Sequence, residues 1–149
     1  MFNNLIFDLD DNIFDYSNSY KRSINCIFDF IYKNYKIDKK LLKCKFEGIK
    51  KIFQNETKNQ ACSHNKFIQL KKFSESLNLS YRELLNIYNL YLSEFYKNLK
   101  LFDYIINFLE LCKVLEINCY ILSNNLCYEQ INVLDKLKII DYFKKIYTS

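Results

Sequence analysis

Three carboxylates at the end of a short apolar run are the residues of this sequence best suited to chemistry. Asp8, Asp10 and Asp11 end the apolar run of residues 5–7 and 9, which predicts a buried strand of a parallel sheet. Ligands of open α/β sheets bind at the carboxyl ends of such strands. Asp8 and Asp10 start on the same side of an extended chain, and a hard cation such as Mg²⁺ would relieve their repulsion. The alternative is a solvated acidic turn that ends the strand.

A second group of polar residues follows another apolar run near the end of the chain. Residues 117–122 predict a strand, and Ser123, Asn124 and Asn125 come directly after it, before a predicted helix. A hydroxyl beside the backbone N–H groups that open a helix can hold a phosphate oxygen. The alternative is an ordinary Ser/Asn helix cap, and the three residues by themselves do not decide between the two.

Four amphipathic helices are predicted between these two groups, because apolar residues recur there at spacings of three and four. The predicted helices cover roughly residues 17–35, 39–53, 67–77 and 81–99. Asp38 is expected to cap the second helix, and Ser80 with Glu83 is expected to form a capping box before the fourth. The polar residues 54–65 lack periodicity and are expected to form a loop.

The second half of the sequence alternates helix and strand, which is typical of an α/β fold. Asp103 is expected to cap a helix that continues to about Glu116. The strand 117–122, a helix over 126–137 and a final strand over 144–148 follow. The predicted order is therefore a strand, four helices, and then helix, strand, helix and strand.

The composition indicates one folded domain of ordinary size. Half of the 149 residues are hydrophobic and 17% are aromatic, whereas disordered chains are poor in such residues. The net charge is +5, and residues 33–72 carry 12 Lys against 3 acidic residues. This segment would suit a phosphorylated substrate, or it is a solvated lysine-rich surface. Nucleic acid is not expected as a partner, because the chain has only two Arg and no known nucleic-acid motif.

The cysteines and the single histidine form no recognisable site. No Cys-x-x-Cys pair is present, so free thiols are expected, most of them as small core residues. No signal peptide and no membrane-spanning run is recognisable, and a cytoplasmic protein without a membrane partner is expected. His64 lies in the predicted polar loop, where a surface position is expected rather than a catalytic one. The six cysteines are Cys26, Cys44, Cys62, Cys112, Cys119 and Cys127.

Residues 7–15 resemble the first motif of the haloacid dehalogenase-like (HAD) hydrolases. That motif is usually written Asp-x-Asp-x-Thr, and Asn12 stands here in place of the Thr. The resemblance implies that Asp8 is the nucleophile that becomes phosphorylated and that Asp10 is the general acid/base. It also implies a Mg²⁺ ion, held by the carboxylate of Asp8 and the backbone carbonyl of Asp10.

Residues 121–143 resemble the strand, phosphate-binding hydroxyl, helix and connector around the second motif of the same family. The resemblance implies that Ser123, with Asn124, binds the phosphate. The Lys of the third family motif and the acidic pair of the fourth have no counterpart before Ser149. A chain truncated before these two motifs is therefore expected.

The resemblance implies an α/β fold with a partial Rossmann-like parallel sheet, formed by residues 1–16 and 100–149. Residues 17–99 would form an inserted four-helix cap. The implied function is Mg²⁺-dependent hydrolysis of a small phosphorylated metabolite, a phosphate monoester, through an aspartyl-phosphate. A catalytically inactive fragment or interaction module of the same fold is the alternative, and the oligomeric state stays open.

Two further readings of the acidic pair are disfavoured. Dehalogenases of the same family usually lack the second Asp, which is Asp10 here. Receiver-like phospho-acceptor domains also have acidic residues after their first strand, but they alternate strand and helix from the start. The long helical insertion after Asp15 does not fit that pattern.

Overall fold

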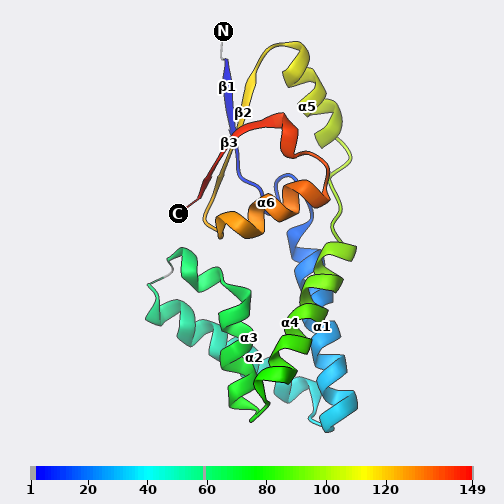
Figure 1. The fold of residues 1–149 in the computed structure, drawn as a ribbon, viewed down its shortest axis with the longest axis vertical. Helices are drawn as coiled ribbons and strands as arrows, with labels where there is room; N and C mark the ends of the chain where they lie inside the picture. Colours follow the sequence, from blue (N-terminus) through cyan, green and yellow to red (C-terminus); the bar gives the residue numbers. More distant parts are fainter. Residues whose placement is uncertain (1–2, 59, 149) are drawn as a thin grey trace. The chain divides into compact units, whose positions relative to one another are not determined.

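The computed structural model describes residues 3–58 and 60–148, and it confirms the predicted α/β fold with a parallel sheet. Within these residues the strands lie in the order β1-β2-β3. Figure 1 shows β1 in blue, β2 in yellow and β3 in red. The strands are β1 (Asn4–Phe7), β2 (Asn118–Ser123) and β3 (Phe143–Thr148). All pairs are parallel, with Phe7 beside Ile121, so the carboxyl ends of the strands lie at one edge of the sheet.

The chain divides into two compact units. Unit 1 contains Met1–Ser19 and Asn98–Ser149, and unit 2 contains Tyr20–Lys97. Besides the sheet, unit 1 holds the helices α5 (Ile105–Val114) and α6 (Cys127–Lys136) and the short 3-10 helix η2 (Ile140–Tyr142).

Inside unit 1, the segments that lead into and out of unit 2 pair with each other. Phe14 and Leu101 form an antiparallel bridge. The N–H of Asp15 donates to the carbonyl of Lys100 at 3.0 Å. The segment that carries the acidic turn is thereby tied to the segment that leads to α5.

One face of the sheet is buried and the other is exposed. α5 packs on β2 and α6 packs on β3. On the buried face the ring of Phe7 meets those of Phe108 and Phe143 edge to face, at 6.0 and 5.9 Å. On the opposite face Ile6 is 66% exposed and Leu122 is 56% exposed. The prediction of a buried first strand is therefore wrong for this face, because β1 is an edge strand and α5 and α6 cover only the face that carries Phe7.

Unit 2 consists of the predicted helices and one 3-10 helix, which lies in the predicted loop, around an aromatic core. Within the described residues they are α1 (Tyr16–Tyr35, which begins in unit 1), α2 (Lys39–Glu56), the 3-10 helix η1 (Ala61–His64), α3 (Lys66–Ser76) and α4 (Tyr81–Lys97). The rings of Phe28, Phe46 and Phe73 pack edge to face with centroids 5.2–6.0 Å apart. These three residues come from α1, α2 and α3, so the aromatic cluster joins helices that are separate in the sequence.

The two helix starts predicted from capping residues are confirmed. Oδ1 of Asp38 accepts the N–H groups of Lys40 and Leu41 at 2.9 and 3.1 Å. The N–H of Ser80 donates to Glu83 Oε2 at 2.6 Å, and the N–H of Glu83 donates to Ser80 Oγ at 3.3 Å. These side chains satisfy N–H groups that a helix start leaves without a partner.

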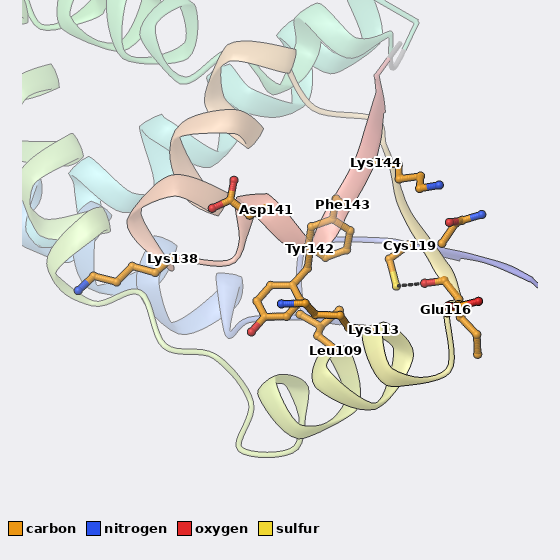
Figure 2. A pocket seen from close by; sticks show the side chains of 11 residues that line it. Leu109, Lys113, Glu116, Cys119, Lys138, Asp141, Tyr142, Phe143 and Lys144 are labelled. Carbon is orange, nitrogen blue, oxygen red and sulfur yellow. Dashed lines mark hydrogen bonds between the residues drawn. The ribbon is translucent and has the colours of Figure 1, made fainter.

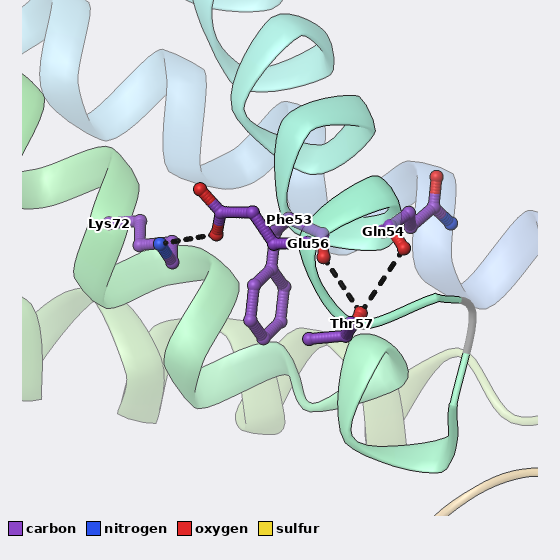
Figure 3. Close-up of polar contacts among 5 residues, drawn as sticks. All are labelled: Phe53, Gln54, Glu56, Thr57 and Lys72. Atoms are coloured by element: carbon purple, nitrogen blue, oxygen red, sulfur yellow. Dashed lines mark hydrogen bonds and ion pairs between the residues drawn. The ribbon is translucent and has the colours of Figure 1, made fainter.

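The predicted polar loop after the second helix is shorter than expected. α2 continues to Glu56, and Thr57 then donates its hydroxyl to the carbonyl of Phe53 at 2.7 Å (Figure 3). Lys72 of α3 pairs with Glu56 at 3.0 Å, and its ammonium lies 5.3 Å from the centroid of the Phe53 ring. Tertiary contacts with α3 therefore extend the helix through residues that carry no apolar periodicity.

The prediction for the start and end of α5 is wrong. α5 begins at Ile105, and Tyr104 precedes it without a capping bond from its side chain. Asp103 lies one position too early to cap; its side chain is 96% exposed, 4.0 Å from the ammonium of Lys100. At the other end Glu116 adopts a positive φ of 53°, which ends the helix before the predicted position.

The prediction that most cysteines are core residues is also wrong. Cys112 and Cys119 are buried, whereas Cys44, Cys62 and Cys127 are exposed. The exposed three lie on outward positions of α2, η1 and α6, so the pattern of the helices decides their burial rather than the residue type. In the described part of the chain, no helix combines the length and apolarity needed to cross a bilayer.

Candidate active site

The first candidate residues lie where β1 ends and the chain turns. Asp8 follows β1 and is exposed, and its Oδ1 accepts the N–H of Leu9 at 2.9 Å. The carbonyl of Leu9 accepts the N–H groups of Asn12 and Ile13 at 3.4 and 3.0 Å. The side chains of Leu9 and Ile13 are fully buried. The turn is thus anchored by apolar side chains, while the carboxylate of Asp8 stays accessible to a ligand.

Asp11, the third acidic residue, has a structural role. Its Oδ1 accepts the N–H of Ser17 at 2.8 Å, and its Oδ2 accepts the Ser17 hydroxyl at 2.5 Å. Ser17 lies in the first turn of α1, where a negative charge is favourable. Asp11 also has a positive φ of 55°, a conformation that Asp tolerates better than most residues. Both oxygens of Asp11 are therefore used to hold the turn against α1, which leaves Asp8 and Asp10 as candidate reactive carboxylates.

Ser123, the candidate phosphate-binding residue, is the last residue of β2 and is 4% exposed. Its Oγ accepts two hydrogen bonds, from the backbone N–H of Asn125 at 3.1 Å and from Nε2 of Gln130 at 3.0 Å. The hydroxyl lies at the start of the segment that leads into α6. Both donors come from the α6 side, so they hold the oxygen in a defined position at the sheet edge.

Asn125 connects the two candidate groups. Its side-chain amide donates to Oδ2 of Asp10 at 2.5 Å, while its backbone N–H donates to Ser123. The parallel register of β1 and β2 makes this possible, because it places the segments after both strands at the same edge of the sheet. Asp10 and Ser123 are thereby brought together in unit 1.

The sequence did not identify Gln130, and it placed Asn125 in the second polar group without assigning it a contact with Asp10. Gln130 is 2% exposed and shares the buried face of α6 with Val133 and Leu134. A polar residue at an apolar position of an amphipathic helix is the signal that could have found it. Asn125 has no such signal, because its role depends on contact with a residue 115 positions away.

Two other sequence-predicted positions lie at the surface of the site. Asn124 is exposed and follows Ser123 directly. Asn12 is also exposed, and its carbonyl accepts the hydroxyl of Tyr104 at 3.3 Å. The structure therefore fixes the backbone of Asn12, while its side chain faces solvent.

The oxygen atoms at this edge suit a hard cation. Among the described residues, no group of three His, Cys, Asp or Glu gathers as a metal site. Mg²⁺ needs fewer protein ligands, because it binds through one or two carboxylates and keeps water or phosphate oxygens as its other ligands. Asp8 supplies a carboxylate and Asp10 a backbone carbonyl oxygen, and among the described residues Oδ1 of Asn125 is a buried oxygen without a hydrogen-bond partner. The donor set therefore fits Mg²⁺, with Asp8 and Asp10 as the residues that would hold it.

A pocket of about 570 Å³ lies away from these residues (Figure 2). Asn118, Cys119 and Phe143 line it, and they mark the amino ends of β2 and β3, opposite the candidate site. Burial, together with the neighbouring Cys112, raises the pKa of the Cys119 thiol to about 11. This thiol stays protonated near neutral pH and is not a candidate nucleophile.

The comparison with protein families gives one match over nearly the whole chain. The sequence model of the family described as haloacid dehalogenase-like hydrolases matches residues 5–149. No curated protein matches the sequence.

Solved structures share the fold at low sequence identity. A candidate β-phosphoglucomutase from Thermotoga maritima is 18% identical with a TM-score of 0.68, over 99% of this chain and 61% of that protein. A 2-haloacid dehalogenase from Pseudomonas syringae is 14% identical with a TM-score of 0.68, over 99% and 64%. The candidate HAD-hydrolase YfnB from Bacillus subtilis, bound to magnesium, is 16% identical with a TM-score of 0.65, over 99% and 64%. The chain therefore spans less than two thirds of the length of these structures.

Proposed function

We propose that this chain, which belongs to the haloacid dehalogenase-like hydrolases, carries the catalytic residues of a Mg²⁺-dependent phosphatase for a small phosphate monoester. The observation that supports this most is the pair of hydrogen bonds from Asn125 to Asp10 and Ser123. These bonds connect the carboxylate of Asp10, which can transfer protons, with the hydroxyl of Ser123, which can bind a phosphoryl oxygen. Both groups are proposed to act beside the exposed carboxylate of Asp8.

The proposed reaction has two displacement steps at phosphorus. A carboxylate oxygen of Asp8 attacks the phosphorus, the bond to the leaving oxygen breaks, and Asp10 gives that oxygen a proton. Water then attacks the aspartyl-phosphate while Asp10 takes up a proton from it. Inorganic phosphate leaves, and the Asp8 carboxylate and the protonated Asp10 are regenerated.

The remaining residues bind and orient the phosphoryl group. The Ser123 hydroxyl donates a hydrogen bond to a phosphoryl oxygen, and Asn124 is proposed to assist at the mouth of the site. Asn125 holds the Asp10 carboxylate toward this group through the 2.5 Å hydrogen bond. When bound by Asp8 and Asp10, Mg²⁺ would supply positive charge that neutralises the phosphoryl oxygens.

The presence of Asp10 favours phosphoryl transfer over dehalogenation. Displacement of a halide from carbon needs the nucleophile but no acid to protonate a leaving oxygen, since a halide leaves as an anion. Asp10 has such an acid role only in the phosphatase reaction. Unit 2 would then act as the helical cap, and its excess of Lys would attract a phosphorylated metabolite.

A module of the same fold without turnover of its own is the second candidate. The exposure of Ile6 and Leu122 on one sheet face favours it, because parallel sheets are usually covered on both faces.

Hydrolysis of a generic aryl phosphate by the purified 149-residue chain separates the two candidates. Turnover that needs Mg²⁺, stops on chelation and is lost in Asp8→Asn supports the phosphatase. The matched control is Asp103→Asn, which removes an exposed carboxylate of unit 1 outside the site. Absence of turnover from a folded, Mg²⁺-loaded chain would overturn the phosphatase proposal for this chain and leave the module.

A further inference from the structure

Gln130 is a buried polar residue to which the proposed reaction assigns no role. It is 2% exposed, on the face of α6 that otherwise buries Val133 and Leu134. A buried amide lowers stability unless it is hydrogen-bonded, and its Oε1 has no hydrogen-bond partner among the described residues. Its Nε2 makes one bond, to Oγ of Ser123 at 3.0 Å. An apolar residue would fill this position at lower cost, so the bond to Ser123 is the feature that needs an explanation.

The hydrogen bonds of Ser123 limit what its hydroxyl can do. A serine hydroxyl has one O–H to donate and two lone pairs to accept with. The backbone N–H of Asn125 and Nε2 of Gln130 both donate to Oγ, at 3.1 and 3.0 Å. With both lone pairs used, the O–H cannot point at either donor, and it must be given to a third group.

We propose that Gln130 is a positioning residue that, together with the Asn125 N–H, makes Ser123 an obligate hydrogen-bond donor toward an oxyanion. This inference rests on the proposed function, and it deepens it by defining the ligand chemistry that Ser123 accepts. A phosphoryl or other anionic oxygen offers the acceptor that the hydroxyl requires. An amine or another donor group cannot bond to Ser123, because both lone pairs of its Oγ already accept hydrogen bonds. The selectivity of the site for oxyanions is therefore partly set by a residue of α6 that contacts Ser123 and not the ligand.

Binding of inorganic phosphate by the folded chain in the presence of Mg²⁺ tests this without turnover. Ser123→Ala should weaken phosphate binding about tenfold, the effect of one hydrogen bond to a charged group. Gln130→Met should weaken it about three- to tenfold with the Tm unchanged or raised, because an apolar residue of similar shape suits the position. The combined variant should be no weaker than Ser123→Ala alone, since Gln130 acts only through Ser123. Asn132→Met, which removes another side-chain amide of α6, is the matched control and should leave binding unchanged.

The outcomes separate this inference from the proposed function. If the losses of phosphate binding in Ser123→Ala and Gln130→Met are non-additive but the chain hydrolyses no phosphate ester, the role of Gln130 is supported and the phosphatase proposal fails. If the chain hydrolyses the ester but the two substitutions weaken phosphate binding additively, the role of Gln130 is overturned and the phosphatase proposal stands. A wild-type chain that binds no phosphate overturns the inference, because Ser123 then does not bind an oxyanion.

A second measurement keeps the test decisive if Gln130→Met does not fold. The side-chain NH₂ signals of Gln130 in ¹⁵N-resolved NMR spectra should move and exchange faster with water in Ser123→Ala. Gln130→Glu, which replaces the donor by an acceptor for the Ser123 O–H, should weaken phosphate binding. Unmoved NH₂ signals, or phosphate binding retained in Gln130→Glu, would show that Gln130 does not donate to Ser123.

Discussion

The side-chain amide of Asn125 donates to Oδ2 of Asp10 at 2.5 Å, which joins the segment after β2 to the turn after β1. The same residue donates its backbone N–H to Ser123. One asparagine thus sets the position of an acidic side chain relative to a hydroxyl that lies 113 residues further along the chain. Both groups need a fixed geometry for chemistry on one phosphoryl group.

Loss of this connection is expected to reduce turnover more than substrate binding. In Asn125→Ala the Asp10 carboxylate loses this donor and can rotate away from the leaving oxygen, so kcat should fall about 10- to 100-fold, a part of the ~10²- to 10⁴-fold that general acid–base catalysis contributes. Steady-state kinetics with an aryl phosphate measures this, with Asn132→Ala as the control on α6. An unchanged kcat would show that Asp10 is positioned without Asn125.

Asp11 is expected to matter for stability and not for the reaction. Asp11→Ala removes both hydrogen bonds to Ser17 and places Ala at a positive φ, so the free energy of unfolding should fall by about 1–3 kcal/mol. Urea unfolding measures the loss, and Asp103→Ala is the control because that side chain is exposed. A loss of turnover at temperatures where Asp11→Ala is fully folded would instead place Asp11 in the reaction.

His64 is expected to make stability depend on pH. Burial, and then the charges of Lys66 and Lys50, lower the pKa of His64 below its ordinary value of 6.5. The unfolded chain therefore binds this proton more readily, so the contribution to stability is complete above pH 6.5 and is lost as pH falls through the folded pKa.

The single histidine makes this prediction direct to measure. One imidazole resonance should titrate in ¹H NMR with a midpoint below pH 6.5, and His64→Gln should flatten the fall in the urea midpoint between pH 7 and 5. A midpoint at or above pH 6.5 would contradict the lowering of the His64 pKa by burial and by the two lysines.

The aromatic cluster of unit 2 is expected to carry much of its stability. Phe46 is 1% exposed and its ring contacts those of Phe28 and Phe73. Phe46→Ala should lower the free energy of unfolding by about 3–5 kcal/mol, because it leaves a cavity in the core. Calorimetric or urea unfolding measures this, with Tyr81→Ala as the control because Tyr81 is 67% exposed. Equal effects of the two substitutions would show that the cluster is not the core of unit 2.

Local patterns in the sequence were sufficient for most of the helices. The apolar spacing over α1 and the capping residues Asp38 and Ser80 act between neighbours in the chain, so they can be read without tertiary structure. The wrong predictions fall where a local signal competes with tertiary contacts. α2 continues to Glu56 because Lys72 of another helix pairs with it, and Asp103 is one residue too early to cap.

The sequence by itself determined the α/β order of the chain and the candidates Asp8, Asp10 and Ser123, because these depend on residue types directly beside apolar runs. Only the tertiary structure decided that Asp11 is used by Ser17 and that Asn125 joins Asp10 to Ser123. It also decided that Gln130, on the buried face of α6, donates a hydrogen bond to Ser123. The physical reason is that these hydrogen bonds depend on the register between β1 and β2 and on the packing of α6 against the sheet, which are set by the burial of residues far apart in the chain.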